Sequence, residues 1–160
     1  MEMVIWMCFQ PQRAMKKLLG LKTIDGLGNF WTQQIITESL EDAIDVYAAD
    51  LDGDGDLDVL AAAKQDDRIV WYKNLDGLGS FGTQQIITTL TDGANSVYAI
   101  DIDGDGDIDV LSSSFNDNKI AWYENLDGLG NFGMQKIITT NALSTFVVYA
   151  ADLDLSLIHI

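Results

Sequence analysis

One stretch decides how the rest of the sequence is interpreted: Asp50-Leu51-Asp52-Gly53-Asp54-Gly55-Asp56-Leu57-Asp58, which returns as Asp101-Ile102-Asp103-Gly104-Asp105-Gly106-Asp107-Ile108-Asp109. Each copy places five carboxylates on alternate positions, and these groups repel one another strongly unless a cation lies among them. Carboxylate oxygens suit a hard divalent metal, and neither run contains a His or Cys that would indicate a softer one. We therefore predict an oxygen-lined cation site, with Ca²⁺ as the first candidate and Mg²⁺ as the alternative.

The positions within the run differ in what they offer a metal. When the first Asp is counted as position 1, the side chains of Asp52, Asp54 and Asp58 fall at positions 3, 5 and 9. Asp56, at position 7, is placed to offer its backbone carbonyl. Gly55 falls where the chain must turn sharply, a conformation that a residue without a Cβ adopts without a clash. The order of residue types is thus that of a loop wrapped around one ion.

An EF-hand is the first competing interpretation, because the residues after Asp58 could begin a helix. An EF-hand loop requires a bidentate Glu at position 12, where this chain has Ala61 in one copy and Ser112 in the other. The second copy continues as Ser112-Ser113-Ser114, which is a poor helix interior. The other alternative is a solvated acidic turn without metal, which two near-identical copies disfavour.

The chain repeats itself from Lys22 onward with a period of 51 residues. Asp25-Gly26-Leu27-Gly28-Asn29-Phe30, for example, returns with small changes at residues 76–81 and 127–132. A fixed period near 50 is typical of stacked supersecondary units. Within one period, turn residues separate four short apolar runs: Val46–Ala49, Leu57–Ala63, Arg68–Leu75 and Thr83–Thr88. We predict an all-β fold in which each 51-residue unit is one four-stranded antiparallel blade of a β-propeller.

The third apolar run of the unit is hydrophobic on both faces. Ile69 and Trp71 point to one side of the expected strand, and Val70 and Tyr72 point to the other. A strand with two apolar faces belongs to a sheet that is covered on both sides. This pattern fits a blade that lies between two neighbouring blades.

The predicted architecture is a partial propeller rather than a closed one. It has two full blades at about residues 44–90 and 95–140, an orphan outer strand before them and a partial third repeat at 145–160. Residues 1–21 match nothing downstream, so we expect an unmatched, disordered or foreign leader before the repeat region 22–160. In the partial repeat, Asp152 and Asp154 keep the first two ligand positions but the rest of the loop is lost, which predicts no complete third site.

Composition restricts the classes of partner. The chain has 160 residues, a formal net charge of −16 and 48% hydrophobic residues, so it can bury a core but repels phosphate backbones. We therefore expect no nucleic-acid partner and no anionic membrane surface. No stretch reaches the roughly 18 consecutive apolar residues of a transmembrane segment, and no secretory signal is visible near Met1. Cys8, the sole cysteine, excludes an intrachain disulfide.

The acidic loop, the following Ile-Val-Trp-Tyr-Lys-Asn and the Gly-x-Gly-x-Phe turn together resemble the FG-GAP repeats, also called VCBS-type repeats, of the integrin α N-terminal propeller superfamily. The resemblance covers roughly residues 22–154. It implies a calcium loop between the first two strands of each blade, a ring of usually seven blades, and a secreted or cell-surface protein. Carried over by position, it implies one structural Ca²⁺ at Asp50, Asp52, Asp54, Asp56 and Asp58, and another at Asp101, Asp103, Asp105, Asp107 and Asp109.

These observations predict a non-catalytic, calcium-binding propeller segment for extracellular recognition, adhesion or an accessory role. Its partner is expected to be a protein or a carbohydrate. An open arc of blades leaves apolar faces and strand edges uncovered, so further blades from a parent chain or self-association are expected to close the ring. The alternatives are a fragment of a propeller-based hydrolase or lyase, and a carbohydrate-binding module that uses the pairs Trp71-Tyr72 and Trp122-Tyr123. An enzyme is disfavoured because every Asp cluster repeats with the blades and no nucleophile has a base in sight.

Overall fold

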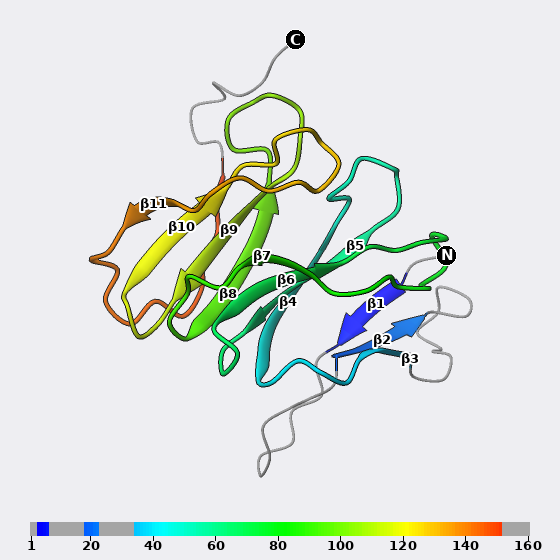
Figure 1. Cartoon of the computed structure of the whole chain (residues 1–160), viewed down its shortest axis with the longest axis horizontal. Coiled ribbons are helices and arrows are strands. Elements are labelled where there is room, and N and C mark those ends of the chain that lie inside the picture. The colour runs from blue at the N-terminus through cyan, green and yellow to red at the C-terminus, as the bar shows by residue number, and fades with distance from the viewer. Residues whose placement is uncertain (1–2, 7–17, 23–33, 152–160) are drawn as a thin grey trace.

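The computed structural model describes residues 3–6, 18–22 and 34–151, and the regular elements in these ranges are all strands. They form two four-stranded sheets and one three-stranded sheet, each antiparallel throughout (Figure 1). The strands are β1 (Met3–Trp6), β2 (Leu18–Lys22), β3 (Gln34–Thr37), β4 (Ala43–Ala49), β5 (Asp58–Ala63), β6 (Arg68–Tyr72), β7 (Gln85–Thr88), β8 (Ala94–Ile100), β9 (Asp109–Ser114), β10 (Lys119–Tyr123) and β11 (Lys136–Thr139). The described residues contain no helix that could span a lipid bilayer.

Strands β4 to β7 form the first blade, with the strands side by side in chain order. The turn between β5 and β6 needs a left-handed residue, and Asp67 takes that place with a φ of 51°. Strand β6 ends at Tyr72, earlier than the predicted run, because Asn74 pairs with Phe81 only in an isolated bridge. The four strands predicted for each period are present, and they form the predicted four-stranded antiparallel sheet.

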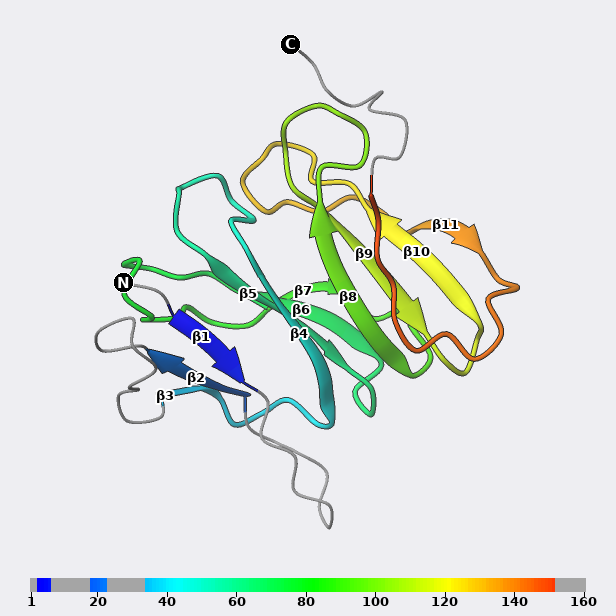
Figure 2. The same ribbon diagram turned by 180° about the vertical axis from the view of Figure 1, so that it is seen from behind.

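Strands β8 to β11 form the second blade, and they copy the first with an offset of 51 residues. The copy includes the irregularities: the register shift between Ala43 and Asp45 returns between Ala94 and Ser96. The two blades pack face to face, with the first strands β4 and β8 beside each other (Figures 1 and 2). The prediction of an all-β fold with two antiparallel blades is confirmed, and the described sheets do not close into a ring.

The third sheet, in the order β1-β2-β3, lies on the other side of the first blade (Figure 1). Leu18 pairs with Thr37 in this sheet as Ile69 pairs with Thr88 in the first blade, so β2 and β3 are equivalent to β6 and β7. The strand equivalent to β6 therefore begins at Leu18, four residues before Lys22, where the repeat becomes visible in the sequence. The structure forms β1 and most of β2 inside residues 1–21, where an unmatched leader was expected.

The core lies in two layers, one on each face of the first blade. Ile69 and Trp71 pack in the layer toward the second blade, whereas Val70 and Tyr72 pack in the layer that contains Leu18. All six residues of β5 are buried, which explains why Ala61 and its neighbours are small and apolar rather than alternating with polar residues. The predicted two-sided burial of β6 is confirmed.

Residues 142–151 run along the second blade without forming a named strand (Figure 2). The Asn95 side-chain amide donates to the Phe146 carbonyl at 2.7 Å, and the Val148 N–H donates to the Ser96 hydroxyl at 3.3 Å. The ring of Tyr149 lies 4.6 Å from that of Tyr98, much as Tyr98 lies 4.9 Å from Tyr47. This segment therefore occupies the position at which the first strand of another blade would begin. Asp152 and Asp154, and with them the predicted loss of a third site, lie outside the described residues.

Candidate metal centre

The two aspartate loops connect the first and second strands of their blades and project from the same end of the sheets (Figure 1). Pairing of Ala49 with Asp58 closes the first loop, and pairing of Ile100 with Asp109 closes the second. Gly55 has a φ of 91°, in the left-handed region, and an added Cβ would have no neighbour within 4 Å. Glycine is therefore needed here for its backbone conformation and not for space, as the predicted sharp turn requires.

Three carboxylates converge in each loop, but the two sets differ in one member. The first loop brings together Asp50, Asp52 and Asp54, with ligand oxygens within 4.8 Å of one another. The second loop brings together the equivalents of the first two, Asp101 and Asp103, with Asp109, again within 4.8 Å. Each set therefore offers a hard, all-oxygen environment for one cation.

The last Asp of each loop closes the hairpin with hydrogen bonds. Asp58 is fully buried, and its carboxylate accepts from the N–H of Leu51 at 3.0 Å and of Asn74 at 2.8 Å. Burial raises the pKa of Asp58 to about 6. Asp109 makes the equivalent bonds with the N–H groups of Ile102 and Asn125 at 3.0 and 2.8 Å, and burial raises its pKa as well. Both residues thus tie the loop to the start of β5 or β9 and to the segment that follows the third strand.

The first Asp of each loop shapes the turn around itself. The Asp50 carboxylate accepts from the N–H groups of Asp54 at 3.1 Å and Gly55 at 2.9 Å. In the second loop, the N–H groups of Gly104 and Gly106 donate to Asp101 at 2.7 and 3.0 Å. These bonds curl the backbone around the carboxylate and hold it among the other acid groups.

The fourth Asp of each loop points to the Asp-Gly-Leu-Gly turn of its own blade. A Cβ added to Gly77 would overlap the Asp56 carboxylate, and one added to Gly128 would overlap that of Asp107. Reduced solvation and the negative charges of Asp105 and Asp127 raise the pKa of Asp107. The structure thus places the side chains of these two predicted site residues beside the acid clusters, and the use of the Asp56 backbone carbonyl as a ligand stays a prediction.

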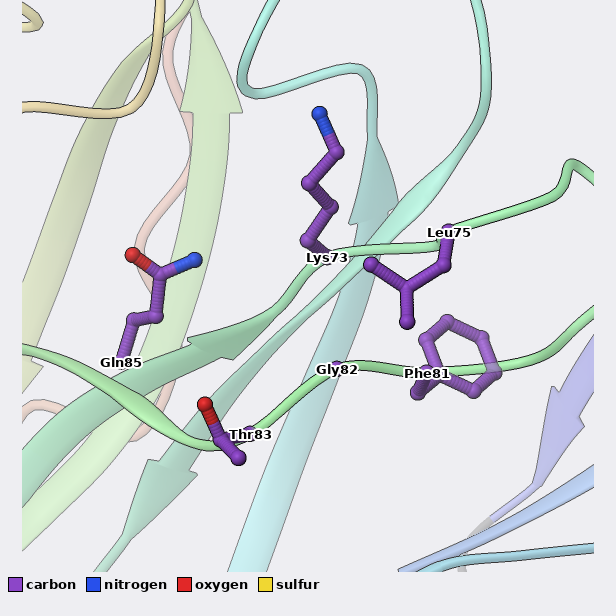
Figure 3. Close-up of a pocket in the computed structure, with 6 residues that line it drawn as sticks. All are labelled: Lys73, Leu75, Phe81, Gly82, Thr83 and Gln85. Carbon is purple, nitrogen blue, oxygen red and sulfur yellow. The ribbon is translucent and has the colours of Figure 1, made fainter.

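The first loop contains a cation that the sequence analysis missed. The Lys73 ammonium forms a close ion pair with Asp52 and another with Asp54 at 3.0 Å. Lys73 borders an open hollow of about 560 Å³ between the end of β6 and the start of β7, but its side chain points away from Thr83 and Gln85 toward the β4–β5 loop (Figure 3). The pKa of Asp54 is lowered by the hydrogen bond from the Asp56 N–H and by Lys73.

The donor set of each loop, all carboxylate oxygens, fits a calcium ion. The Asp52 side chain is only 5% exposed, and its Oδ1 atom is buried without a hydrogen-bond partner. A buried, unpaired carboxylate oxygen is costly unless a cation reaches it, so this atom points to a missing ligand. Asp50, Asp52 and Asp54 are the residues that would hold the ion in the first loop, and Asp101, Asp103 and Asp109 are those in the second.

Consecutive four-stranded blades, each with an acidic loop between its first two strands, define a repeat protein of the β-propeller type. Comparison with protein families gives a match to the FG-GAP-like repeat at residues 19–61, 50–112 and 101–155. The chain therefore belongs to the family of FG-GAP-like repeat proteins, as the resemblance in the sequence indicated. A search of curated proteins gave no match.

Proposed function

We propose that the chain is a calcium-stabilised segment of a β-propeller that serves extracellular or cell-surface recognition, either in adhesion or as an accessory module. The observation that carries the proposal is the convergence of three carboxylates in each of two equivalent loops. The buried, unpaired Oδ1 of Asp52 supports it, because this oxygen lacks a partner that a cation would supply. Weak calcium sites of extracellular modules saturate at millimolar calcium, which is compatible with loops as open as these.

The proposed role of calcium is structural. A bound divalent ion would neutralise carboxylates that otherwise repel one another within 4.8 Å. Asp50 also accepts hydrogen bonds from the turn backbone, and Asp58, the first residue of β5, accepts one from the Leu51 N–H in the loop. Order imposed on the first loop therefore passes directly to the β4–β5 hairpin. The second loop is built in the same way around β8 and β9.

Further blades are part of the proposal because one face of the second blade lacks the cover that the first blade has. Ile69 and Trp71 are 0% and 2% exposed beneath the second blade, whereas their equivalents Ile120 and Trp122 are only partly buried. Phe146, in the segment against the second blade, is 65% exposed. An additional repeat unit, from the same polypeptide or from a second copy, would cover this face as the second blade covers the first.

The proposed partner is a protein or a carbohydrate. A net charge of −16 opposes binding to nucleic acid and to anionic lipid. The Trp71-Tyr72 pair is buried in the core, so it is not available for stacking against a sugar. A catalytic role, as part of a hydrolase or lyase, is the alternative. It is disfavoured because both described acid clusters recur with the blades, whereas an active site is usually built once.

Thermal unfolding of the purified chain tests the calcium proposal. We expect millimolar calcium to raise Tm relative to a chelator, as followed by circular dichroism, and the double variant Asp54→Ala/Asp103→Ala, which removes one carboxylate from each acid cluster, to lose this rise. Asp92→Asn is the matched control, because it removes an exposed carboxylate near the opposite end of the blades, where Asp92 accepts a hydrogen bond from Asn116. An identical Tm of the wild-type chain in calcium and in chelator would refute the proposed role of calcium.

A further inference from the structure

The two aspartate loops have the same five acid positions but neighbours of opposite charge. The residue that follows the third strand is Lys73 in the first blade and Glu124 in the second, 51 positions later. On the outer strand, Gln85 of the first blade is replaced by Lys136 in the second. A positive charge thus follows the third strand in one blade and lies on the outer strand in the other.

In the first blade, this positive charge enters the acid cluster. The Lys73 ammonium pairs with the Oδ2 atoms of Asp52 and Asp54, two of the three carboxylates that converge there. The side chain of Asp52 is 5% exposed, so its charge is largely removed from water and gains most from a nearby cation. Lys73 therefore supplies part of the charge that a metal would bring, as the direction of its side chain toward the loop illustrates (Figure 3).

In the second blade, the corresponding charges are used elsewhere. Glu124 forms a close ion pair with Lys136, whose ammonium also lies 4.2 Å from the centre of the Trp122 ring. No lysine or arginine in the described ranges forms an ion pair with the carboxylates of the second loop. Within those ranges, the second cluster has no side-chain counter-ion.

We propose that Lys73 is a tethered counter-ion of the first loop, so that the second loop is the stronger calcium site and the first binds calcium only by displacing this ammonium. The difference in calcium affinity rests on the proposed calcium binding. The role of Lys73 as a counter-ion concerns the calcium-free protein and does not depend on that proposal. Displacement breaks two charge-assisted hydrogen bonds before the metal gains its ligands, which lowers the apparent affinity.

Calcium titration of single-loop variants of the full chain tests the affinity. Asp103→Asn/Asp105→Asn disables the second loop and keeps the first loop intact. Asp50→Asn/Asp54→Asn disables the first loop and keeps the second intact. By isothermal titration calorimetry, we expect the first loop to bind Ca²⁺ roughly tenfold more weakly than the second, and Lys73→Gln to remove this difference, since the broken hydrogen bonds involve charged groups. In the second loop, Glu124→Lys/Lys136→Gln recreates the arrangement of the first blade and should weaken binding by a similar factor.

The controls separate charge from bulk and from position. Lys73→Arg keeps the charge and should keep the weak affinity of the first loop. Lys119→Gln removes a lysine at the β9–β10 turn, where it pairs with Asp117 at 2.7 Å, and should change neither affinity. In chelator, Lys73→Gln should lower Tm because two carboxylates lose their counter-ion. Glu124→Gln breaks an ion pair outside the acid clusters and should lower Tm less.

The outcomes distinguish this inference from the proposed function. If both loops bind calcium and Lys73→Gln changes neither the affinity of the first loop nor Tm in chelator, the inference is overturned and calcium binding stands. If no variant binds calcium, the proposed function fails together with the affinity difference. A lower Tm of Lys73→Gln in chelator would then still identify Lys73 as a counter-ion, whereas an unchanged Tm would overturn this too.

Discussion

The two blades differ less in their backbones than in what surrounds them. Strand order, registers and the hydrogen bonds of the aspartate loops recur at an offset of 51 residues. The first blade is covered on both faces, and Lys73 enters its acidic loop. The second blade is covered fully on one face, and in the described residues its loop has no such lysine. The same sequence motif therefore lies in two environments that differ in burial and in charge. Mutations at equivalent positions can measure how much this difference contributes to stability.

The largest difference is expected at the equivalent tryptophans. Trp71 is 2% exposed, and its ring meets the edge of Phe132 from the second blade at a centroid distance of 6.4 Å. Trp71→Ala should therefore lower the free energy of unfolding by about 3–5 kcal/mol, the usual range for a buried aromatic residue. Trp122→Ala should cost less than half as much, because Trp122 is only partly buried. Chemical denaturation monitored by circular dichroism measures both values.

A control for the tryptophan comparison keeps an aromatic ring at the position. Trp71→Phe should recover much of the lost stability, since it leaves a smaller cavity beside Phe132. Equal losses for Trp71→Ala and Trp122→Ala would contradict the view that only the first blade is covered on both faces. Gly130 of the second blade gives an independent check of how closely that blade covers Trp71. A Cβ at this position would overlap the Trp71 ring, and Gly130 has a φ of 82°.

The next effect is expected to be equal in the two blades in chelator, since Asp109, unlike Asp58, also belongs to an acid cluster that would hold calcium. Asp58→Ala leaves two buried backbone N–H groups without an acceptor, and Asp109→Ala does the same in the second blade. At about 1–2 kcal/mol for each unpaired group, each variant should lose about 2–4 kcal/mol. The loss at Asp58 should be the same in calcium and in chelator, because Asp58 stays outside the first acid cluster. A larger loss in calcium than in chelator would make Asp58 a metal ligand as well.

Sequence patterns predicted the parts of this molecule that repeat. The four strands of each unit, the two apolar faces of β6 and the turn at Gly55 all follow from hydrophobic alternation and glycine placement. Convergence of Asp50, Asp52 and Asp54 follows from their alternate spacing in a tight loop. These features are local or recur, so one copy supports the interpretation of the other.

Features that differ between copies were missed, and the reasons are physical. β2 keeps only the apolar character of β6 and lacks its Trp-Tyr pair, so Leu18 was not aligned with Ile69. The ion pair of Lys73 with Asp52 joins residues that are 21 positions apart, and alternation within the loop carries no information about it. The available signal was the charge reversal between Lys73 and Glu124 at the repeat period.

A smaller effect should separate the loops by their calcium response. Asp101→Ala should remove more of the calcium-induced rise in Tm than the equivalent Asp50→Ala, because the second loop depends on an external cation. For a chain of this size, we expect the two variants to differ by about 5 °C in this rise. Scanning calorimetry at matched calcium and chelator concentrations measures the difference. Equal responses of the two variants would indicate equivalent sites.

The smallest predicted effect concerns the first strands, where the two interfaces can be compared directly. The Ser96 hydroxyl donates to Asp45 at 2.7 Å in the first blade and accepts from the Val148 N–H at 3.3 Å. Ser96→Ala should cost about 1–2 kcal/mol, since one of these bonds involves a charged acceptor. Most of that loss should come from the Asp45 side, because the acceptor there is charged, and the Val97 N–H, which remains as a donor at 3.0 Å to the same carboxylate oxygen, keeps the loss small. A double-mutant cycle with Asp45→Ala isolates this term, and a coupling energy near zero would mean that Ser96 stabilises only the segment containing Val148.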